Sequence, residues 1–165
     1  MSNIYVLGAG MVGSAMAIDL AKKHHVTISD ISSEVLSRVV EKEPSLKTEI
    51  LDVTDTKDLA SKIKDADLVL SAVPGFLGFE TLKKIILQGK NTVDISFFPE
   101  NVLELNQLAL ENNVTAIVDC GVAPGMDNVI LGYYNETHDI DFFECLVGGL
   151  PKVKKWPFCY KAPFS

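Results

Sequence analysis

The sequence has few cysteines, a shortage of basic residues and no long apolar run. Its 165 residues include three cysteines, and 15 Lys+Arg stand against 22 Asp+Glu, for a formal net charge of −7. The odd cysteine number, without CxxC or His-paired spacing, argues against a disulfide scaffold or a metal site and fits a reducing compartment. The acidic balance excludes a nucleic-acid binder that is held by phosphate neutralisation.

Other missing features narrow the class further. A membrane span needs roughly 18 consecutive apolar residues, and the sequence contains no such run. The first residues carry no basic segment of the kind that opens a secretory signal. Because 47% of the residues are apolar and 22% are charged, the chain is not a disordered tail. We therefore expect a cytoplasmic globular protein with neither a nucleic-acid nor a membrane partner.

Short apolar runs rich in β-branched residues alternate with helical patterns along the chain. The runs span residues 4–7, 26–29, 49–53, 68–72, 92–96 and 115–118. Between them, apolar residues recur at the i, i+4 spacing of helices, and the last such stretch is expected to open at Pro99-Glu100. Strands with almost no polar alternation, separated by helices, are typical of a parallel sheet covered on both faces. The sequence predicts a doubly wound α/β fold with a mostly parallel sheet.

A glycine-rich turn joins the first predicted strand to the first predicted helix, with the sequence GAGMVG at residues 8–13. Gly8 permits the tight turn, Gly10 lets the backbone approach a pyrophosphate, and Gly13 lets the helix lie close to the sheet. The pyrophosphate would sit at the helix N-terminus, beside Met11 and Val12. A tight turn without a ligand is the alternative, but the flanking strand and helix favour a Rossmann-type dinucleotide-binding loop.

Asp30 ends the second predicted strand, roughly twenty residues beyond the glycine turn, where a carboxylate accepts hydrogen bonds from ribose hydroxyls. A carboxylate at ~4 Å from the 2′-phosphate of NADP is opposed by about 4 kcal/mol at an effective dielectric near 20. No arginine follows within residues 31–34 to offset this repulsion. The sequence therefore predicts NAD rather than NADP. Alternatively Asp30 only caps the helix at 32–40, which Ser32 or Ser33 could also do.

Ligands bind at the carboxyl ends of the strands in an open parallel sheet, so residues there are further candidates. Asp52 ends the third predicted strand and either reaches the adenine amino group or is a solvated turn residue. Ala72, Val73 and Pro74 end the fourth and would lie beside the nicotinamide ribose.

Two carboxylates and a thiol end the last two predicted strands. Asp94 and Asp119 follow apolar runs, so partial desolvation would raise the pKa of either carboxyl toward that of a useful base. The alternative is that each caps the next helix. Cys120 is either a small buried hydrophobe or a residue that faces the substrate.

The pattern changes after residue 119, and we expect a domain boundary there. Residues 1–122 form the expected dinucleotide-binding domain, and residues 123–165 form a linker helix and the beginning of a truncated α/β substrate domain. That second part is expected to contain a helix at 128–133 and a strand at 142–147. The aromatic residues Trp156, Phe158 and Tyr160 require burial by a homodimer contact or a further domain. A homodimer is the partner that we expect.

The whole chain resembles the saccharopine dehydrogenase superfamily, and within it the lysine 6-dehydrogenase-like branch. The motifs that carry the resemblance are VLGAGMVG at 6–13, AVPGFLG at 72–78, VDISFFPE at 93–100, DCGVAPGM at 119–126, VGGLP at 147–151 and YKAPFS at 160–165. The resemblance implies a Rossmann domain with an inserted substrate domain, and oxidation of a carbon–nitrogen bond of an amino acid with NAD(P). Asp94, Asp119 and Cys120 would then line the reacting centre.

The resemblance also bears on the substrate. Glutamate-forming saccharopine dehydrogenases carry an acidic residue where this sequence has Ala123, which favours the lysine 6-dehydrogenase-like reaction. In that reaction the ε-carbon of L-lysine gives a hydride to the nicotinamide, and the imine is hydrolysed to allysine. Saccharopine dehydrogenases and carboxynorspermidine-type dehydrogenases are the alternatives among enzymes. A regulatory module that senses NAD without turnover is the alternative outside them.

Overall fold

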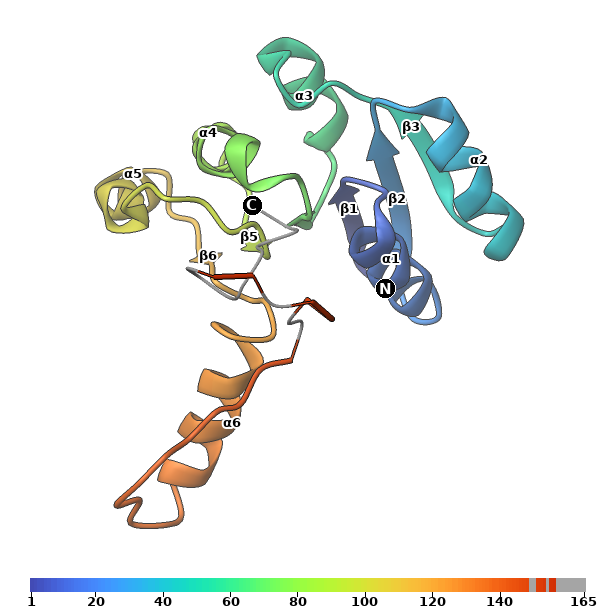
Figure 1. The fold of residues 1–165 in the computed structure, drawn as a ribbon. Helices are drawn as coiled ribbons and strands as arrows, with labels where there is room; N and C mark the ends of the chain where they lie inside the picture. Colours follow the sequence, from blue (N-terminus) through green and yellow to red (C-terminus); the bar gives the residue numbers. More distant parts are fainter. Residues whose placement is uncertain (149–150, 154, 157–165) are drawn as a thin grey trace.

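The computed structural model describes residues 1–148, 151–153 and 155–156, and its centre is one parallel sheet. The sheet has six strands in the order β3-β2-β1-β4-β5-β6 (Figure 1). They are β1 (Asn3–Leu7), β2 (His25–Asp30), β3 (Lys47–Ile50), β4 (Leu68–Ser71), β5 (Thr92–Asp94) and β6 (Ala116–Ile117). Every neighbouring pair is parallel, and the order reverses between β1 and β4. The predicted doubly wound α/β fold is confirmed.

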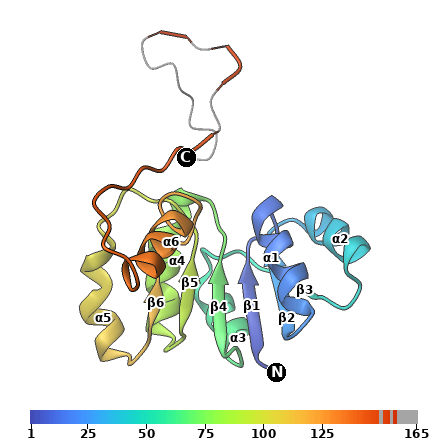
Figure 2. The ribbon, with the colours of Figure 1, turned by 90° about the horizontal axis from the view of Figure 1, so that it is seen from below.

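Helices cover both faces of the sheet (Figures 1 and 2). They are α1 (Met11–Ala21), α2 (Ser33–Lys42), α3 (Thr56–Ile63), α4 (Gly75–Leu87), the 3-10 helix η1 (Val102–Leu105), α5 (Asn106–Glu111) and α6 (Met126–Asn135). One core cluster packs α1 and α2 against the sheet, and a second packs α3 and α4 against its other face. A third cluster joins α4 to η1 and α5.

The alternation of side chains along β1 shows why both faces must be covered. Ile4 and Val6 belong to the core on the α1 and α2 face, whereas Tyr5 and Leu7 belong to the core on the α3 and α4 face. Successive side chains of a strand point to opposite faces, so a strand that is apolar throughout needs a helix layer on each side. The uninterrupted apolar run of β1 therefore fits its position inside the sheet, between β2 and β4.

Several expected boundaries are wrong by up to three residues, and two of them have a clear physical reason. The third strand is β3 at Lys47–Ile50, whereas residues 49–53 were expected, because Leu51 and Val53 leave the strand and enter the core under α3 and α4. The stretch expected to open at Pro99-Glu100 opens at η1 instead, where Asn101 accepts a hydrogen bond from the Leu103 N–H.

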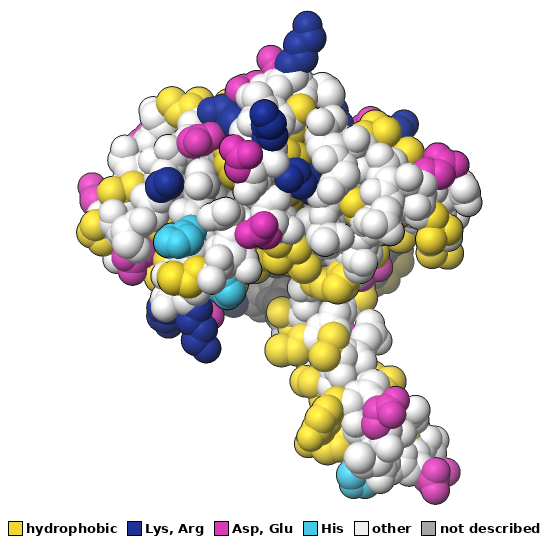
Figure 3. Space-filling model, turned by 180° about the vertical axis from the view of Figure 1, so that it is seen from behind, with side chains coloured by type: hydrophobic (Ala, Val, Ile, Leu, Met, Phe, Trp, Pro, Cys, Tyr) yellow, Lys and Arg dark blue, Asp and Glu magenta, His cyan; other side chains and the backbone are white. Residues whose placement is uncertain are grey.

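The chain leaves the sheet after β6, and α6 extends away from it as an arm (Figure 1). Hydrophobic side chains gather on this arm, and Val129, Ile130 and Tyr133 are exposed (Figure 3). The expected strand at 142–147 is not formed: these residues are exposed, and no described strand lies beside them to supply hydrogen bonds. The proposed domain boundary stays a prediction.

The aromatic residues near the end of the chain were expected to require burial. Trp156 is 87% exposed, whereas Phe158 and Tyr160 lie outside the described residues. Within the described part of the chain, no helix is both long and apolar enough to cross a bilayer.

Candidate functional site

The glycine turn between β1 and α1 lies against the end of β4. Gly8 has φ +94°, and a Cβ built on it would lie 2.5 Å from the Ala72 carbonyl oxygen. A Cβ on Gly13 would lie 2.0 Å from the Gly8 carbonyl oxygen. Since real Cβ atoms do not approach a backbone oxygen this closely, the packing of the protein itself requires glycine at both positions.

Gly10 differs from these two glycines, because no atom lies within 4 Å of the Cβ position built on it. Its backbone is extended, at φ −63°, and it is the N-cap residue of α1. No side chain in the described part of the chain caps this helix, and both Met11 and Val12 are exposed. The first turn of α1 therefore presents N–H groups and a positive dipole end to an open space, which suits a bound phosphate group.

The Asp30 carboxylate lies beside the glycine turn at the end of β2. Its Oδ2 accepts a hydrogen bond from the Ala9 N–H at 2.8 Å, and its Oδ1 accepts one from the Ser32 N–H at 2.9 Å. The cap of α2 is Ser32, whose hydroxyl accepts from the Val35 N–H at 3.3 Å. Asp30 thus connects the turn to the start of α2 and leaves the capping to Ser32.

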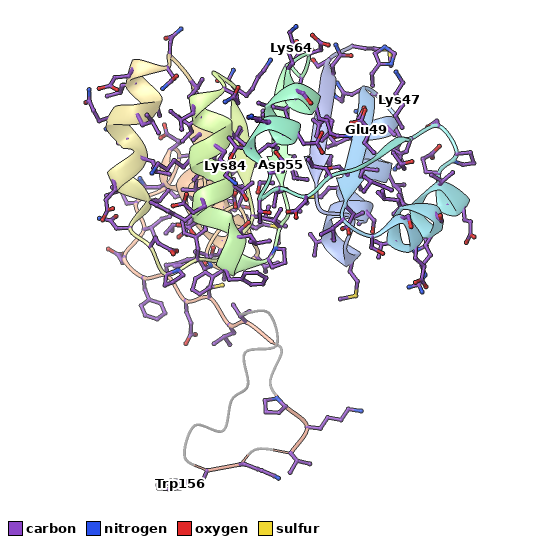
Figure 4. The ribbon with its side chains drawn as sticks, turned by 90° about the horizontal axis from the view of Figure 1, so that it is seen from above. Lys47, Glu49, Asp55, Lys64, Lys84 and Trp156 are labelled. Carbon is purple, nitrogen blue, oxygen red and sulfur yellow. The ribbon has the colours of Figure 1, made fainter. Side chains whose placement is uncertain are left out.

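Asp52 lies in an exposed turn that follows β3. Its Oδ1 accepts hydrogen bonds from the Thr54 N–H at 2.8 Å and from the Thr54 hydroxyl at 2.7 Å. These bonds hold the pKa of Asp52 below its usual value, chiefly through the hydroxyl. Lys84 of α4 donates to the Thr54 carbonyl at 2.8 Å and lies beside Asp55 (Figure 4). The geometry suits a solvated turn residue, and the contact with adenine stays a prediction.

The segment that follows β4 forms one side of the glycine turn. The Ala72 N–H donates to the Leu7 carbonyl at 2.8 Å, and the Ala72 carbonyl faces Gly8. Val73 is buried, and Pro74 is the N-cap residue of α4. The fold therefore brings the two expected cofactor-binding segments, residues 8–13 and 72–74, into direct contact.

Asp94, at the end of β5, lies in the interior and has 0% of its surface exposed. Its Oδ1 accepts a hydrogen bond from the Ser96 N–H at 2.5 Å. Its Oδ2 and the hydroxyl of Ser71, the residue in register with it on β4, have no hydrogen-bond partner within the described part of the chain. Burial raises the pKa of the Asp94 carboxyl. Asp94 thus lies beneath the surface where a substrate would bind.

Asp119 and Cys120 follow β6 and lie next to the end of β5. The Cys120 N–H donates to the Asp94 carbonyl at 3.2 Å, which places the three expected catalytic residues together. Asp119 is exposed and has φ +55°, a left-handed conformation that is uncommon outside glycine. Burial, and then the charges of Asp94 and Asp119, raise the pKa of the Cys120 thiol, which is therefore protonated at neutral pH.

Ser96 is a residue of this region that the sequence did not single out. Its hydroxyl donates to the Val73 carbonyl at 3.1 Å, and the residue is buried. The Asp-x-Ser spacing of residues 94–96 is a local turn pattern, but the contact with Val73 reaches the segment that follows β4. Only the fold could reveal it.

The strand order, the glycine turn at its reversal and the neighbouring carboxylate define a dinucleotide-binding domain of the Rossmann class. Residues 4–117 match the family described as "Saccharopine dehydrogenase NADP binding domain". The chain belongs to this family, which confirms the resemblance to the saccharopine dehydrogenase superfamily. The lysine 6-dehydrogenase-like branch stays a prediction.

Individual relatives agree with this assignment. The chain is 28% identical, over 99% of its length, to the saccharopine dehydrogenase [NADP(+), L-glutamate-forming] of Pyricularia oryzae, and 26% identical, over 100%, to that of Schizosaccharomyces pombe. It spans only 38% and 39% of these relatives. The apo saccharopine dehydrogenase (L-Glu forming) of Saccharomyces cerevisiae superposes with a TM-score of 0.71 at 26% identity, over 82% of this chain and 31% of that one.

The buried Asp94 carboxyl predicts a pH dependence of stability. Because its pKa is raised in the folded state, the folded protein retains a proton that the unfolded chain releases near pH ~3.9. This contribution to the free energy of unfolding is present below that pH and is lost as the pH rises through the folded pKa. Asp94→Asn removes the titration, so stability should fall less with rising pH. Urea unfolding of the wild type and of Asp94→Asn, at pH values from about 3.9 upward, measures this difference. A free energy of unfolding that changes with pH in the same way in both proteins would contradict the prediction.

Proposed function

We propose that this chain is the NAD(P)-binding part of an oxidoreductase that acts on a carbon–nitrogen bond of an amino acid. The observation that carries the proposal is the uncapped start of α1, where Gly10 faces open space beside the Asp30 carboxylate. The family match and the names of the relatives support the same class of activity.

Different residues around the glycine turn would bind different parts of a dinucleotide. The N–H groups at the start of α1 would bind the pyrophosphate, and the Asp30 carboxylate would accept hydrogen bonds from the hydroxyl groups of the adenosine ribose. The segment 72–74 would lie beside the nicotinamide ribose, on the β4 side of the crevice. When bound, the nicotinamide ring supplies the hydride acceptor.

Among the three expected catalytic residues, Asp119 best suits direct contact with a substrate. Its carboxylate is exposed at the carboxyl end of the sheet, whereas Asp94 is enclosed and the Cys120 thiol stays protonated. Asp119 would accept a proton from the substrate ammonium group, so that the nitrogen lone pair assists the departure of the hydride from the adjacent carbon.

L-Lysine and saccharopine are the leading candidate substrates, and the polyamine precursors of carboxynorspermidine-type dehydrogenases are the alternative. Ala123 favours L-lysine, whereas the relatives named above are saccharopine dehydrogenases. Within the described residues Cys120 and Cys145 form no disulfide, which agrees with the reducing, cytoplasmic setting that we propose. The exposed apolar side chains of α6 support a homodimer.

A substrate assay decides among the enzymatic and non-enzymatic alternatives. Formation of NADH or NADPH is followed with L-lysine, saccharopine and polyamine precursors, on this chain and on any longer chain that contains it. We expect turnover of one amino acid. Intact dinucleotide binding without turnover of any of them would instead favour a regulatory NAD sensor.

Gly10→Val tests the phosphate-binding turn. Because no atom lies within 4 Å of this position, the variant should fold normally while its side chain occupies the space of the pyrophosphate. We expect calorimetric titration to show that NAD and NADP no longer bind. Gly132→Val is the matched control, since it also points into open space but lies in α6. Retained affinity in Gly10→Val would show that the turn binds no phosphate.

Asp30→Ala tests the choice between coenzymes. The relatives' names carry NADP(+), but we propose that Asp30 makes this chain prefer NAD. Loss of a hydrogen bond to a charged group, about 1.5–3 kcal/mol, should weaken NAD binding roughly tenfold to a hundredfold. NADP should be affected less, because the repulsion of its 2′-phosphate is also removed. Asp67→Ala is the control, because Asp67 also accepts a hydrogen bond from a backbone N–H, that of Asn3 at 2.7 Å, but lies just before β4, at the opposite end of the strands. An equal loss for both coenzymes would remove Asp30 from the ribose.

A further inference from the structure

A chain of hydrogen bonds leads from the buried Asp94 carboxyl group of β5 to residues 72–74. This segment lies against the glycine turn and is called its wall below. Asp94 Oδ1 accepts from the Ser96 N–H at 2.5 Å, and the Ser96 hydroxyl donates to the Val73 carbonyl at 3.1 Å. Asp94 and Ser96 are 0% and 6% exposed. Water cannot replace these bonds without opening the structure, so each costs more to lose than a surface bond.

The segment that accepts the hydrogen bond from Ser96, residues 72–74, also packs against the glycine turn. The Ala72 carbonyl lies where a Cβ of Gly8 would collide with it, and the Ala72 N–H donates to the Leu7 carbonyl at 2.8 Å. The Ile95 N–H donates to the Ser71 carbonyl at 3.0 Å, just before the segment begins. The position of residues 72–74 is thus determined jointly by β1 on one side and by β5 on the other.

Close packing between α4 and the loop after β5 reinforces this arrangement. A Cβ on Gly75 would lie 2.0 Å from the Phe97 carbonyl oxygen, and a Cβ on Gly78 would lie 2.7 Å from Ser96 Cβ. The first turn of α4 therefore rests directly on residues 96–98. We expect the start of α4 and this loop to move together, because neither can shift without a clash.

We propose that Asp94 and Ser96 are positioning residues that fix the Val73–Pro74 segment, and with it the wall against which the nicotinamide half of a dinucleotide rests. This inference depends on the proposed function and gives Asp94 a role that needs no contact with substrate. Within the described residues, Asp94 Oδ2 and the Ser71 hydroxyl have no hydrogen-bond partner by distance and angle, so this interior is polar. A polar interior of this kind is usually tolerated where a functional geometry requires it.

If residues 72–74 become less fixed, the affinity for the nicotinamide half of the dinucleotide should change more than the affinity for the adenosine half. Asp30, which is proposed to bind the adenosine ribose, lies on the β2 side of the turn, whereas Val73 and Ser96 lie on the β4 and β5 side. Loss of the Ser96 hydroxyl should therefore weaken ligands that carry nicotinamide and spare ligands that lack it. A general loss of folding would instead affect both.

The experiment compares NADH with ADP-ribose on Ser96→Ala. We expect the Kd for NADH to rise about threefold to tenfold, from the loss of one buried hydrogen bond, while the Kd for ADP-ribose is unchanged. Ser37→Ala is the matched control, since the Ser37 hydroxyl also donates to a backbone carbonyl but lies on the exposed face of α2.

A second pair of variants tests Asp94. Asp94→Asn keeps an Oδ1 acceptor and should bind NADH as the wild type does, whereas Asp94→Ala should lose affinity.

Amide hydrogen exchange on the free chain supplies a readout without any ligand. Ser96→Ala should speed exchange in residues 72–75 and leave β1 protected. An unchanged Kd for NADH, or an equal loss for NADH and ADP-ribose, overturns the positioning role. Failure of the folded wild-type chain to bind either ligand overturns the proposed function itself, so the two failures are distinguishable.

Discussion

The close approach of Gly8 to the Ala72 carbonyl is the constraint on which the site depends. It lies between β1 and β4, where the strand order reverses and where ligands of doubly wound sheets bind. A side chain at Gly8 would push the two strand ends apart, and one at Gly13 would lift α1 from the turn. With both absent, α1 begins at the surface with its first N–H groups directed outward.

The two sides of this turn have different physical characters. On the β2 side, Asp30 is bound to backbone N–H groups and remains partly accessible, so its charge can act on a ligand. On the β5 side, Asp94 is enclosed, and burial favours its protonated form. Residues of the same type are thus suited to recognition in one place and to internal support in the other, because their exposure to water differs.

The limits of the family match agree with the packing. The match ends at residue 117, where β6 ends, and the sheet with its helices contains all of the large core clusters. Beyond it, α6 has no buried residue, and its apolar side chains face outward (Figure 3). Because the chain spans 38% of a relative such as the Pyricularia oryzae enzyme, the activity of a complete enzyme is a proposal that reaches beyond these residues.

The six strands of the sheet, their parallel arrangement and the glycine turn could be predicted from the sequence, because apolar periodicity and the need for missing Cβ atoms are local properties. The sequence also placed Asp30 at the end of its strand. The enclosure of Asp94, the contact of Ser96 with Val73 and the absence of a strand at 142–147 became visible only in the folded structure. These outcomes depend on which distant segments pack together, and no spacing along the chain records that.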